Sequence, residues 1–346
     1  MIFCGDIALP FINSINLDIP EYLRNKRWIV NLEGSLVDSS EENLQKSVVF
    51  NDFNAIKQLT SSLKISGFSI ANNHTFDIGD LNRSNFYFHQ IGIPYFGSGL
   101  TIADAKKEFV CEDENSIEYE ILSFGWSAIE CKYATATESG VNPYTKENVL
   151  HVVKKVIAGN TLKRIICFFH WNYELELYPQ PLDRELAKKI IDLGVYAVIG
   201  CHAHRVQGYE IYNGRPIIYG LGNFLFPQGI YMNKRLAFPA FSSKEIAVEI
   251  TSMGQFLIHW FQYDSDRNIV SYIKTEELEK SKELELLSPF ANLSNKQYKK
   301  WLKQNRFHKN KLLPLFYYSD SLLSSQLKIK YIKIRHQLIL QLKGLK

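Results

Sequence analysis

The sequence predicts an α/β fold in which buried strands alternate with helices around a central sheet. Two observations carry this prediction. Short apolar runs bounded by turn residues are typical of buried strands, and the clearest are IFCGD, WIVNLE, FSIANNH, RIICFFH and AVIGCHAH. Each run also ends in a carboxylate, an amide or an imidazole, and ligands of open α/β sheets bind beyond the carboxyl ends of the strands.

Strands and helices are expected to alternate over the first 200 residues. A first helix should begin at Asn51 or Asp52, either of which can cap it, and end near Leu63. A second helix should end near Ile91, and further helices should cover residues 145–158 and 182–193. The strands predicted around them cover residues 1–8, 27–33, 67–72, 92–99, 119–126, 164–170 and 195–200.

After residue 200 the sequence becomes richer in strands. Residues 208–226 hold two β-type runs around Asn213-Gly214, the dipeptide that most strongly favours a two-residue hairpin turn. Antiparallel strands are expected to follow at residues 244–251, 255–263 and 268–274. From about Glu276 the chain becomes helical and rich in Lys and Leu. We therefore expect an α/β domain over residues 1–280 and a basic helical extension over 281–346.

Composition narrows the class of protein. The 346 residues are 46% hydrophobic, which is enough to fill a sizeable core. The five cysteines are odd in number and form no CxxC pair, which favours a reducing compartment. The sequence shows no signal-peptide pattern and no apolar run of about 18 residues, so a cytoplasmic protein is expected. It also lacks the basic and aromatic pattern of a nucleic-acid platform.

Charge is concentrated near the end of the chain. Residues 281–346 carry a net charge of +11, whereas the preceding 280 residues carry −7. Apolar residues 327, 331, 334, 338, 342 and 345 recur at helical spacing, between the basic residues Lys328, Lys330, Lys333, Arg335 and Lys343. A basic amphipathic helix within residues 322–346 would lie on the anionic inner face of a membrane. A helix packed on the body and a strand over KIKYIKIR are the alternatives.

The polar side chains at the predicted strand ends form one chemical set. Each of them alone is more typical of a turn or of a satisfied core residue, but they share one position at the edge of the sheet. Together they suit a pair of divalent metals, and the mixture of ligands favours Mn²⁺, Fe or Zn²⁺ over Mg²⁺ or Ca²⁺. The set consists of Asp6, Glu33, Asn73, His74, His170, His202 and His204.

Several segments, in order, resemble the bacterial capsule-biosynthesis family called CapA or PgsA, of the poly-γ-glutamate systems. That family belongs to the calcineurin-like metallophosphoesterase superfamily. The resemblance implies a metallophosphoesterase-like αββα sandwich of two mixed sheets flanked by helices, followed by the C-terminal helical extension. The matching segments span roughly residues 1–275 and are Gly5-Asp6, NLEGSL, ANNHTFDIG, HWNYELELYP, LAKKIIDLGVYAVIGCHAHRVQ and YGLGNFLF.

The resemblance also implies a role for each polar residue. Two divalent ions would be held: the first by Asp6 and His204, the second by Asn73, His170 and His202, with Glu33 bridging them. His74 would face the substrate as proton donor or transition-state stabiliser. The resemblance adds four further candidates, each with a structural alternative. Asp77 would orient a neighbouring side chain or cap a helix, and Glu174 would contact substrate or close a loop. Arg205 would bind an anion or lie on the surface, and Asn223 would contact substrate or form a turn.

This sequence departs from the superfamily pattern at several positions. Ala8 stands where a metal-binding His is common, which leaves the first metal one protein ligand short. Asn172 replaces the Gly that usually follows His-Trp. The usual His-His-Pro-His is here Cys201-His202-Ala203-His204. Residues i and i+2 of a strand point to the same side, so a kink is required if His202 and His204 are to reach two different metals.

The function expected from the resemblance is metal-dependent hydrolysis of a phosphoester or related bond during capsule or exopolymer synthesis. The substrate would be a phosphoester or an anionic polymer, and other capsule-synthesis proteins are possible partners. Two alternatives stay open. One is a non-catalytic subunit of a polymer synthesis or export complex, which the absence of a His at position 8 favours. The other is a γ-glutamyl amide hydrolase or transferase. Five remaining histidines are expected to be structural or exposed: 89, 151, 259, 308 and 336.

Overall fold

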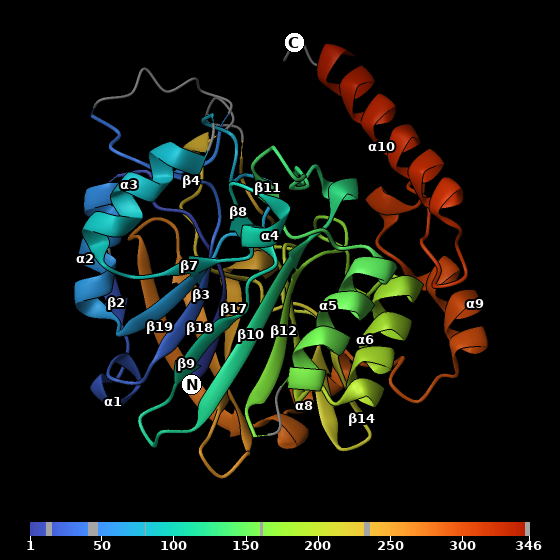
Figure 1. The fold of residues 1–346 in the computed structure, drawn as a ribbon. Helices are drawn as coiled ribbons and strands as arrows, with labels where there is room; N and C mark the ends of the chain where they lie inside the picture. Colours follow the sequence, from blue (N-terminus) through green and yellow to red (C-terminus); the bar gives the residue numbers. More distant parts are fainter. Residues whose placement is uncertain (12–15, 41–47, 80, 160–161, 232–235, 343–346) are drawn as a thin grey trace.

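A computed structural model describes the chain apart from residues 12–15, 41–47, 80, 160–161, 232–235 and 343–346. Two large mixed sheets pack face to face, and helices cover the outer face of each (Figure 1). The predicted sandwich of two mixed sheets flanked by helices is therefore confirmed.

The first large sheet has the strand order β2-β19-β18-β17-β1-β3-β6-β7, and β16 also pairs with β1. Its centre is parallel: β1 runs alongside β3 and β16, and β3 runs alongside β6. Strands β17, β18 and β19 add an antiparallel half. The bounds are β1 Ile2–Ile7, β2 Asn16–Asp18, β3 Trp28–Leu32, β6 Ile65–Ser69, β7 Tyr95–Phe96, β16 Asn223–Leu225, β17 Lys244–Ile250, β18 Phe256–Asp264 and β19 Ile269–Glu277.

The second large sheet has the order β14-β15-β13-β12-β10-β9. Its four inner strands are parallel, and the edge strands β14 and β9 are antiparallel to their neighbours. The bounds are β9 Phe109–Glu112, β10 Glu118–Gly125, β12 Arg164–His170, β13 Ala197–Cys201, β14 Tyr209–Tyr212 and β15 Arg215–Ile218. Two short ribbons complete the described strands: β4 Ser35–Val37 with β5 Phe50–Asp52, and β8 Ser98–Gly99 with β11 Gly140–Val141.

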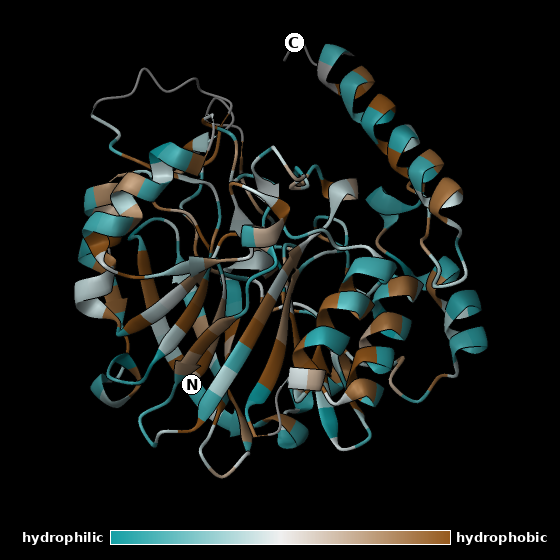
Figure 2. Cartoon of the chain, viewed as in Figure 1, coloured by the Kyte–Doolittle hydropathy of each residue, from teal (hydrophilic) through white to brown (hydrophobic). Residues whose placement is uncertain are grey.

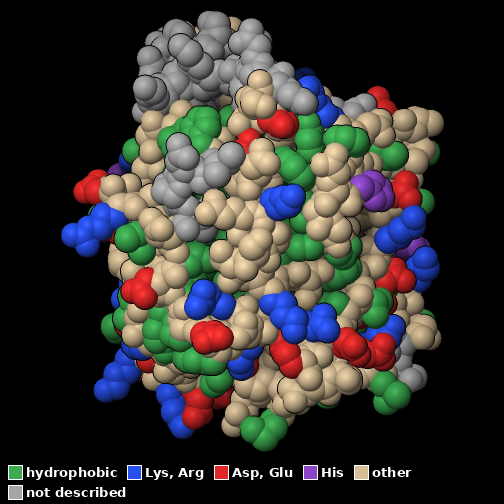
Figure 3. Space-filling model, turned by 90° about the vertical axis from the view of Figure 1, so that its left-hand side faces the viewer, with side chains coloured by type: hydrophobic (Ala, Val, Ile, Leu, Met, Phe, Trp, Pro, Cys, Tyr) green, Lys and Arg blue, Asp and Glu red, His purple; other side chains and the backbone are tan. Residues whose placement is uncertain are grey.

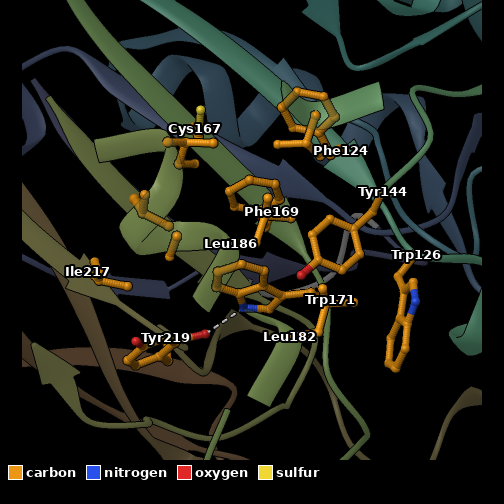
Figure 4. Packing of buried hydrophobic residues seen from close by; sticks show 14 of the residues in the cluster. Phe124, Trp126, Tyr144, Cys167, Phe169, Trp171, Leu182, Leu186, Ile217 and Tyr219 are labelled. Carbon is orange, nitrogen blue, oxygen red and sulfur yellow. Dashed lines mark hydrogen bonds between the residues drawn. The ribbon is translucent and has the colours of Figure 1, made fainter. Parts of the chain in front are cut away.

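Three apolar layers hold the sandwich together. Phe3 of the first sheet and Phe168 of the second meet edge to face between the sheets. Helices α2 and α3 bury their apolar faces on the outer side of the first sheet, and α5 and α6 do so on the second. Figure 4 shows the α6 side chains Leu182 and Leu186 against the aromatic residues of this second outer layer. The first four helices are α1 Glu21–Arg24, α2 Phe53–Ser62, α3 Leu81–Ile91 and α4 Ile102–Ala105; the next two are α5 Lys146–Gly159 and α6 Pro181–Leu193.

The outer faces of α2 and α3 expose mostly polar side chains, together with Phe86 of α3, which is 59% exposed. Figure 3 views the molecule from the left-hand side of Figure 1, and Lys/Arg and Asp/Glu side chains intermingle over the lower part of this face. Such a mixture is typical of a solvated surface.

Local sequence signals explain much of this arrangement. The Asp52 side chain accepts the backbone N–H groups of Asn54 and Ala55, so Asp52 rather than Asn51 caps α2. Asn213 and Gly214 have φ values of 49° and 71°, as the predicted hairpin turn between β14 and β15 requires. Strands β2, β4, β5, β9 and β11 were not predicted, because strands this short are defined by their partners rather than by their own pattern.

The last part of the chain packs on the second sheet and its helices. It contains α8 Lys282–Leu286, α9 Asn295–Asn305 and α10 Leu322–Leu342. Arg184 of α6 is buried, donates to both carboxylate oxygens of Glu210, and also donates to the Leu293 carbonyl at 2.6 Å. The Tyr298 hydroxyl donates to the Pro179 carbonyl at 2.6 Å. Whether residues 281–346 are a separate domain stays a prediction.

Helix α10 confirms the helical prediction for the tail, and the strand alternative is wrong. The predicted apolar stripe nevertheless faces solvent: Leu327, Tyr331, Ile334 and Leu338 are 47–60% exposed. Among the α10 side chains whose burial the structure describes, the buried one is Ile332, which lies outside that stripe. In Figure 2, apolar and polar residues alternate along the visible side of this helix. Residues Lys343 and Leu345 of the predicted pattern lie outside the described residues. None of the helices in the described ranges has both the length and the apolarity needed to cross a bilayer.

The Arg184–Glu210 pair provides a test of how the C-terminal helices are held. Replacing Arg184 with Ala leaves the buried Glu210 carboxylate without its main partner and removes a donor to the Leu293 carbonyl. We expect a loss of about 3–5 kcal/mol in the free energy of unfolding, measured by urea denaturation. The control is Lys189→Ala at an exposed position of α6, which should change it by less than about 0.5 kcal/mol. A small effect at Arg184 would contradict this role.

Candidate metal centre

The predicted ligands converge where both large sheets present the carboxyl ends of their parallel strands. Asp6 lies near the end of β1, and Glu33 directly follows β3. His170 is the last residue of β12 in the other sheet. His202 and His204 follow β13, and Asn73 lies in the turn after β6. The site therefore spans the junction of the two sheets.

The backbone after β13 explains how two histidines so close in sequence diverge. His202 and His204 have φ values of 89° and 49°, in the left-handed region that L-residues rarely adopt. The kink predicted from the His-x-His spacing is thus confirmed. The His202 N–H donates to Asp6 Oδ2 at 3.1 Å, which fixes this turn against β1. Asn172, in the place where the resembled family has Gly, also has a positive φ of 66°.

The side chains form two groups that share one carboxylate. In the first, the ligand atoms of Asp6, Glu33 and His204 lie within 4.8 Å of one another. In the second, the same holds for Glu33, His170 and His202. Asn73 joins the second group, since its Oδ1 lies 2.8 Å from His170 Nε2. This is the grouping implied by the resemblance, with Glu33 between two metals; the role of each residue as a ligand stays a prediction.

The electrostatics of the pocket suit a cation. Glu33 is fully buried, and among the described residues neither of its carboxylate oxygens has a hydrogen-bond partner. Burial, followed by the charge of Asp6, raises the pKa of Glu33 well above its usual value. Burial raises the pKa of Asp6 to about 7 and lowers that of His204 to about 4. A divalent cation would satisfy the two orphaned oxygens and stabilise the charged carboxylates, so the residues present fit a metal pair.

Three asparagines that the sequence reasoning missed hold the predicted ligands in place. Asn31 Nδ2 donates to Asp6 Oδ1 at 2.7 Å. Asn51 Nδ2 donates to the Glu33 carbonyl at 2.9 Å, and the buried Asn72 donates to the Leu32 carbonyl at 2.7 Å. The available signal was a polar amide next to or inside an apolar run, where it must find a partner.

His74 stands beside the two groups without belonging to either. Its Nε2 lies 3.7 Å from Glu33 Oε1, while its Nδ1 lies 2.8 Å from Asp77 Oδ2. Asp77 Oδ2 also accepts the Val49 N–H at 2.9 Å. Since α3 begins only at Leu81, Asp77 orients the His74 ring and does not cap that helix.

The three predicted substrate contacts have different surroundings. Asn223 is buried, and its Oδ1 lies 2.8 Å from His204 Nδ1, so it holds a predicted ligand in place. The Arg205 guanidinium donates to the Leu175 carbonyl at 3.3 Å and lies 4.1 Å from the Phe241 ring centroid. Glu174 is exposed. Contact of these residues with a substrate stays a prediction.

The remaining histidines are structural or exposed, as expected. His259 is buried and lies 3.0 Å from Glu249 Oε2, and His336 lies 2.8 Å from Glu130 Oε1. The other three, residues 89, 151 and 308, are exposed.

Residues 14–228 match the protein family described as bacterial capsule synthesis protein PGA_cap. The chain is 27% identical over 248 residues to the capsule biosynthesis protein CapA of Bacillus anthracis, covering 66% of this chain and 60% of that protein. It is 29% identical over 180 residues to the PGA biosynthesis protein CapA of Bacillus subtilis strain 168, covering 50% of this chain and 46% of that protein. The chain thus spans about half to three-fifths of the length of these relatives.

Among solved structures, a 5'-nucleotidase precursor from Thermus thermophilus aligns with a TM-score of 0.39 and 12% identity. The alignment covers 88% of this chain and 60% of that one. A likeness at this level says nothing about activity.

The shared carboxylate predicts how metal content responds to ligand loss. Purified protein should carry one to two Mn, Fe or Zn ions per chain, and His202→Ala or His170→Ala should remove about one of them because each change breaks the second group. Elemental analysis by plasma mass spectrometry measures this. The control, His89→Ala at an exposed position of α3, should keep the wild-type content. Protein without metal even after reconstitution would rule out the site.

Metal affinity should also depend on pH. In the metal-free protein Asp6 keeps its proton up to about pH 7, so below that value a metal must displace the proton. Between pH 5 and 7, metal affinity should therefore rise by up to about tenfold per pH unit for each proton that the metal displaces. Above pH 7, Asp6 carries no proton to displace and should add no further pH dependence. Titration calorimetry in buffers of different ionisation enthalpy counts the released protons. Affinity independent of pH over this range would contradict the raised pKa.

Proposed function

The chain belongs to the bacterial capsule synthesis protein family, and we propose that it is a metal-dependent hydrolase acting on a phosphoester or related bond in capsule or exopolymer synthesis. The setting follows from the family and from the names of the relatives, which are capsule and PGA biosynthesis proteins. The reaction type is inferred from the site.

One observation carries the proposal. Two ligand groups share the buried carboxylate of Glu33, which has no hydrogen-bond partner among the described residues, and the His74 imidazole faces that carboxylate. Asp6 and His204 would hold one cation, and His170 and His202, with Asn73, would hold the other. When bound, such a pair of cations supplies Lewis-acid activation of water and neutralises charge on a phosphoryl group. The burial of these ligands excludes bulk water from them, which strengthens electrostatic interactions there.

His74 is suited to proton transfer. Its Nδ1 faces Asp77 Oδ2 at 2.8 Å, an arrangement that places a proton on Nδ1 and fixes the orientation of the ring. The other nitrogen, Nε2, is then directed into the pocket on the side of Glu33. His74 is partly exposed, with 19% of its side chain accessible, so a substrate can reach it. We infer that His74 Nε2–H protonates the leaving oxygen or stabilises charge on the substrate.

A non-catalytic subunit of a capsule-synthesis complex is the second candidate. Ala8 is fully buried and offers no ligand where the superfamily has a His, so the first group has one protein ligand fewer. A γ-glutamyl amide hydrolase is the third. An assay of metal-loaded protein against phosphomonoesters, phosphodiesters and γ-glutamyl peptides separates the three candidates. Hydrolysis of an ester supports the proposed hydrolase, and cleavage of a γ-glutamyl peptide supports the amide hydrolase. No turnover on any of these substrates supports the non-catalytic subunit.

Variants at His74 test its role directly. His74→Ala should lower turnover by about 10²–10⁴-fold while metal content stays near wild type, because His74 belongs to neither ligand group. His204→Ala should lose both metal and turnover. A nitrophenyl ester should partly rescue His74→Ala, since its leaving group needs little protonation. The matched control is the exposed His89→Ala, with unchanged turnover.

The same experiment has a clear negative outcome. If His74→Ala loses metal as readily as His204→Ala, His74 is a ligand and the assignment of roles is wrong. If His74→Ala retains full turnover on an unactivated ester, proton donation by His74 is excluded.

A further inference from the structure

A cavity of about 610 Å³ separates the inner face of α10 from the body of the protein. It is distinct from the metal centre, whose predicted ligands do not line it. Its volume falls in the range of about 300–1,000 Å³ that is typical of small-molecule sites. The walls come from residues 126–127, the start of α5, residues 316–318 and α10.

The inner wall of the cavity is apolar. Trp126 packs against Phe316 with ring centroids 4.8 Å apart and against Tyr144 at 6.3 Å. Leu182 of α6 continues this wall, and Figure 4 shows it close to Tyr144 and Trp126. Ile329 adds an apolar side chain from α10. Such a lining favours the apolar body of a ligand over a sugar or a nucleotide.

The charged residues of the cavity leave a positive balance. Its two carboxylates have basic partners: Asp320 pairs with Lys328, and Glu147 lies 3.6 Å from Lys146. Lys330 and Lys333 also line the cavity, and the charge of Lys333 acts on the Glu130 carboxyl as well. An apolar interior with two lysines at its rim is complementary to an anion that carries an apolar chain.

The cavity is continuous with exposed apolar surface. Leu322 and Ile334 line it and are also 62% and 47% exposed. On the same helix Leu323, Leu327 and Leu338 are 53–66% exposed. Figure 1 shows the C-terminal part of α10 standing clear of the body. These exposed side chains extend the apolar lining of the cavity onto the surface of α10.

We propose that this cavity binds the acyl chain of an anionic phospholipid, with Lys330 and Lys333 at its phosphate. The exposed apolar residues of α10 favour a lipid that remains in a bilayer over a free amphiphile, because they would otherwise face water. Binding would hold the metal centre close to the membrane surface, since the Trp126 N–H that borders the cavity donates to the His170 carbonyl at 3.2 Å.

A soluble probe tests the cavity itself. Dodecyl phosphate, titrated calorimetrically into the full chain below its critical micelle concentration, should bind at one saturable site. Ser325→Phe fills the cavity from α10 and should abolish binding, and Ile329→Trp serves the same purpose if the first variant fails to fold. Lys330→Glu with Lys333→Glu should weaken binding at least about tenfold. The control, Leu327→Ser, lies outside the cavity and should bind as wild type.

Vesicles test the source of the ligand. The chain should sediment with phosphatidylglycerol vesicles and not with phosphatidylcholine vesicles, and Ser325→Phe should weaken this binding at least about tenfold. Thermal unfolding and metal content of each variant verify its fold.

Failure to bind dodecyl phosphate overturns the proposal. A second contradicting outcome is that Leu327→Ser abolishes vesicle binding while Ser325→Phe does not affect it. The exposed surface of α10 would then bind the membrane without the cavity. Dodecyl phosphate binding without vesicle binding overturns the assignment to a bilayer. Dodecyl phosphate is itself a phosphomonoester, so binding that Ser325→Phe leaves intact is binding at the metal centre and overturns the proposal. Binding that Ser325→Phe abolishes, while ester hydrolysis stays at the wild-type level, belongs to the cavity and is separate from the proposed function.

Discussion

The buried carboxylate of Glu33 is the constraint around which this structure is organised. It lies at the junction of two sheets, and its two oxygens have no hydrogen-bond partner among the described residues. A folded protein tolerates such a group only if the carboxylate is protonated or if a cation joins it. The surrounding chain supplies the means for the second solution. Asp6 and His204 lie on one side of the carboxylate, and His170 and His202 lie on the other. His202 and His204 both have a left-handed backbone conformation. Each of these conformations costs about 1–3 kcal/mol, which the rest of the fold must offset.

Much of this centre could be predicted from the sequence because the chemistry and the topology coincide. Parallel strands end at one edge, so polar residues that follow several apolar runs were expected to meet, and Asp6, Glu33 and His170 do meet. The supporting amides could not be ranked in the same way. In the sequence, Asn31 and Asn72 do not differ from many other polar residues near strand ends. Only the structure shows that Asn31 donates a hydrogen bond to Asp6 and that Asn72 donates one to the Leu32 carbonyl. The short strands escaped prediction for a related reason, since β9 exists through its pairing with β10.

The tail shows that a local pattern predicts a helix without predicting which of its faces is buried. Helical spacing predicted α10, and the helix is present. The same spacing predicted one apolar stripe and left open whether that stripe lies on a membrane or on the body of the protein. In the structure Leu327 and Tyr331 of the stripe are exposed, while Ile332, outside it, is buried. Sequence periodicity cannot decide this, because the inward face is set by what the helix meets. Here it meets the aromatic residues around Trp126 and Phe316 across a cavity rather than in close contact, so the helix contributes only part of its apolar surface to the core.

The cavity and the metal centre are joined by main chain rather than by side chains. Strands β10 and β12 are paired in parallel up to Gly125 and His170. The next residue, Trp126, donates its N–H to the His170 carbonyl, so one side chain lines the cavity while the other reaches the metal centre. Glu130, a few residues further along, contacts His336 of α10 at 2.8 Å. A displacement of α10 would therefore act on the loop that follows β10, and through a paired backbone on the strand that carries a predicted ligand. Packed backbones of this kind deform little, so a displacement of the Trp126 backbone would be passed on to His170 rather than absorbed between the two strands.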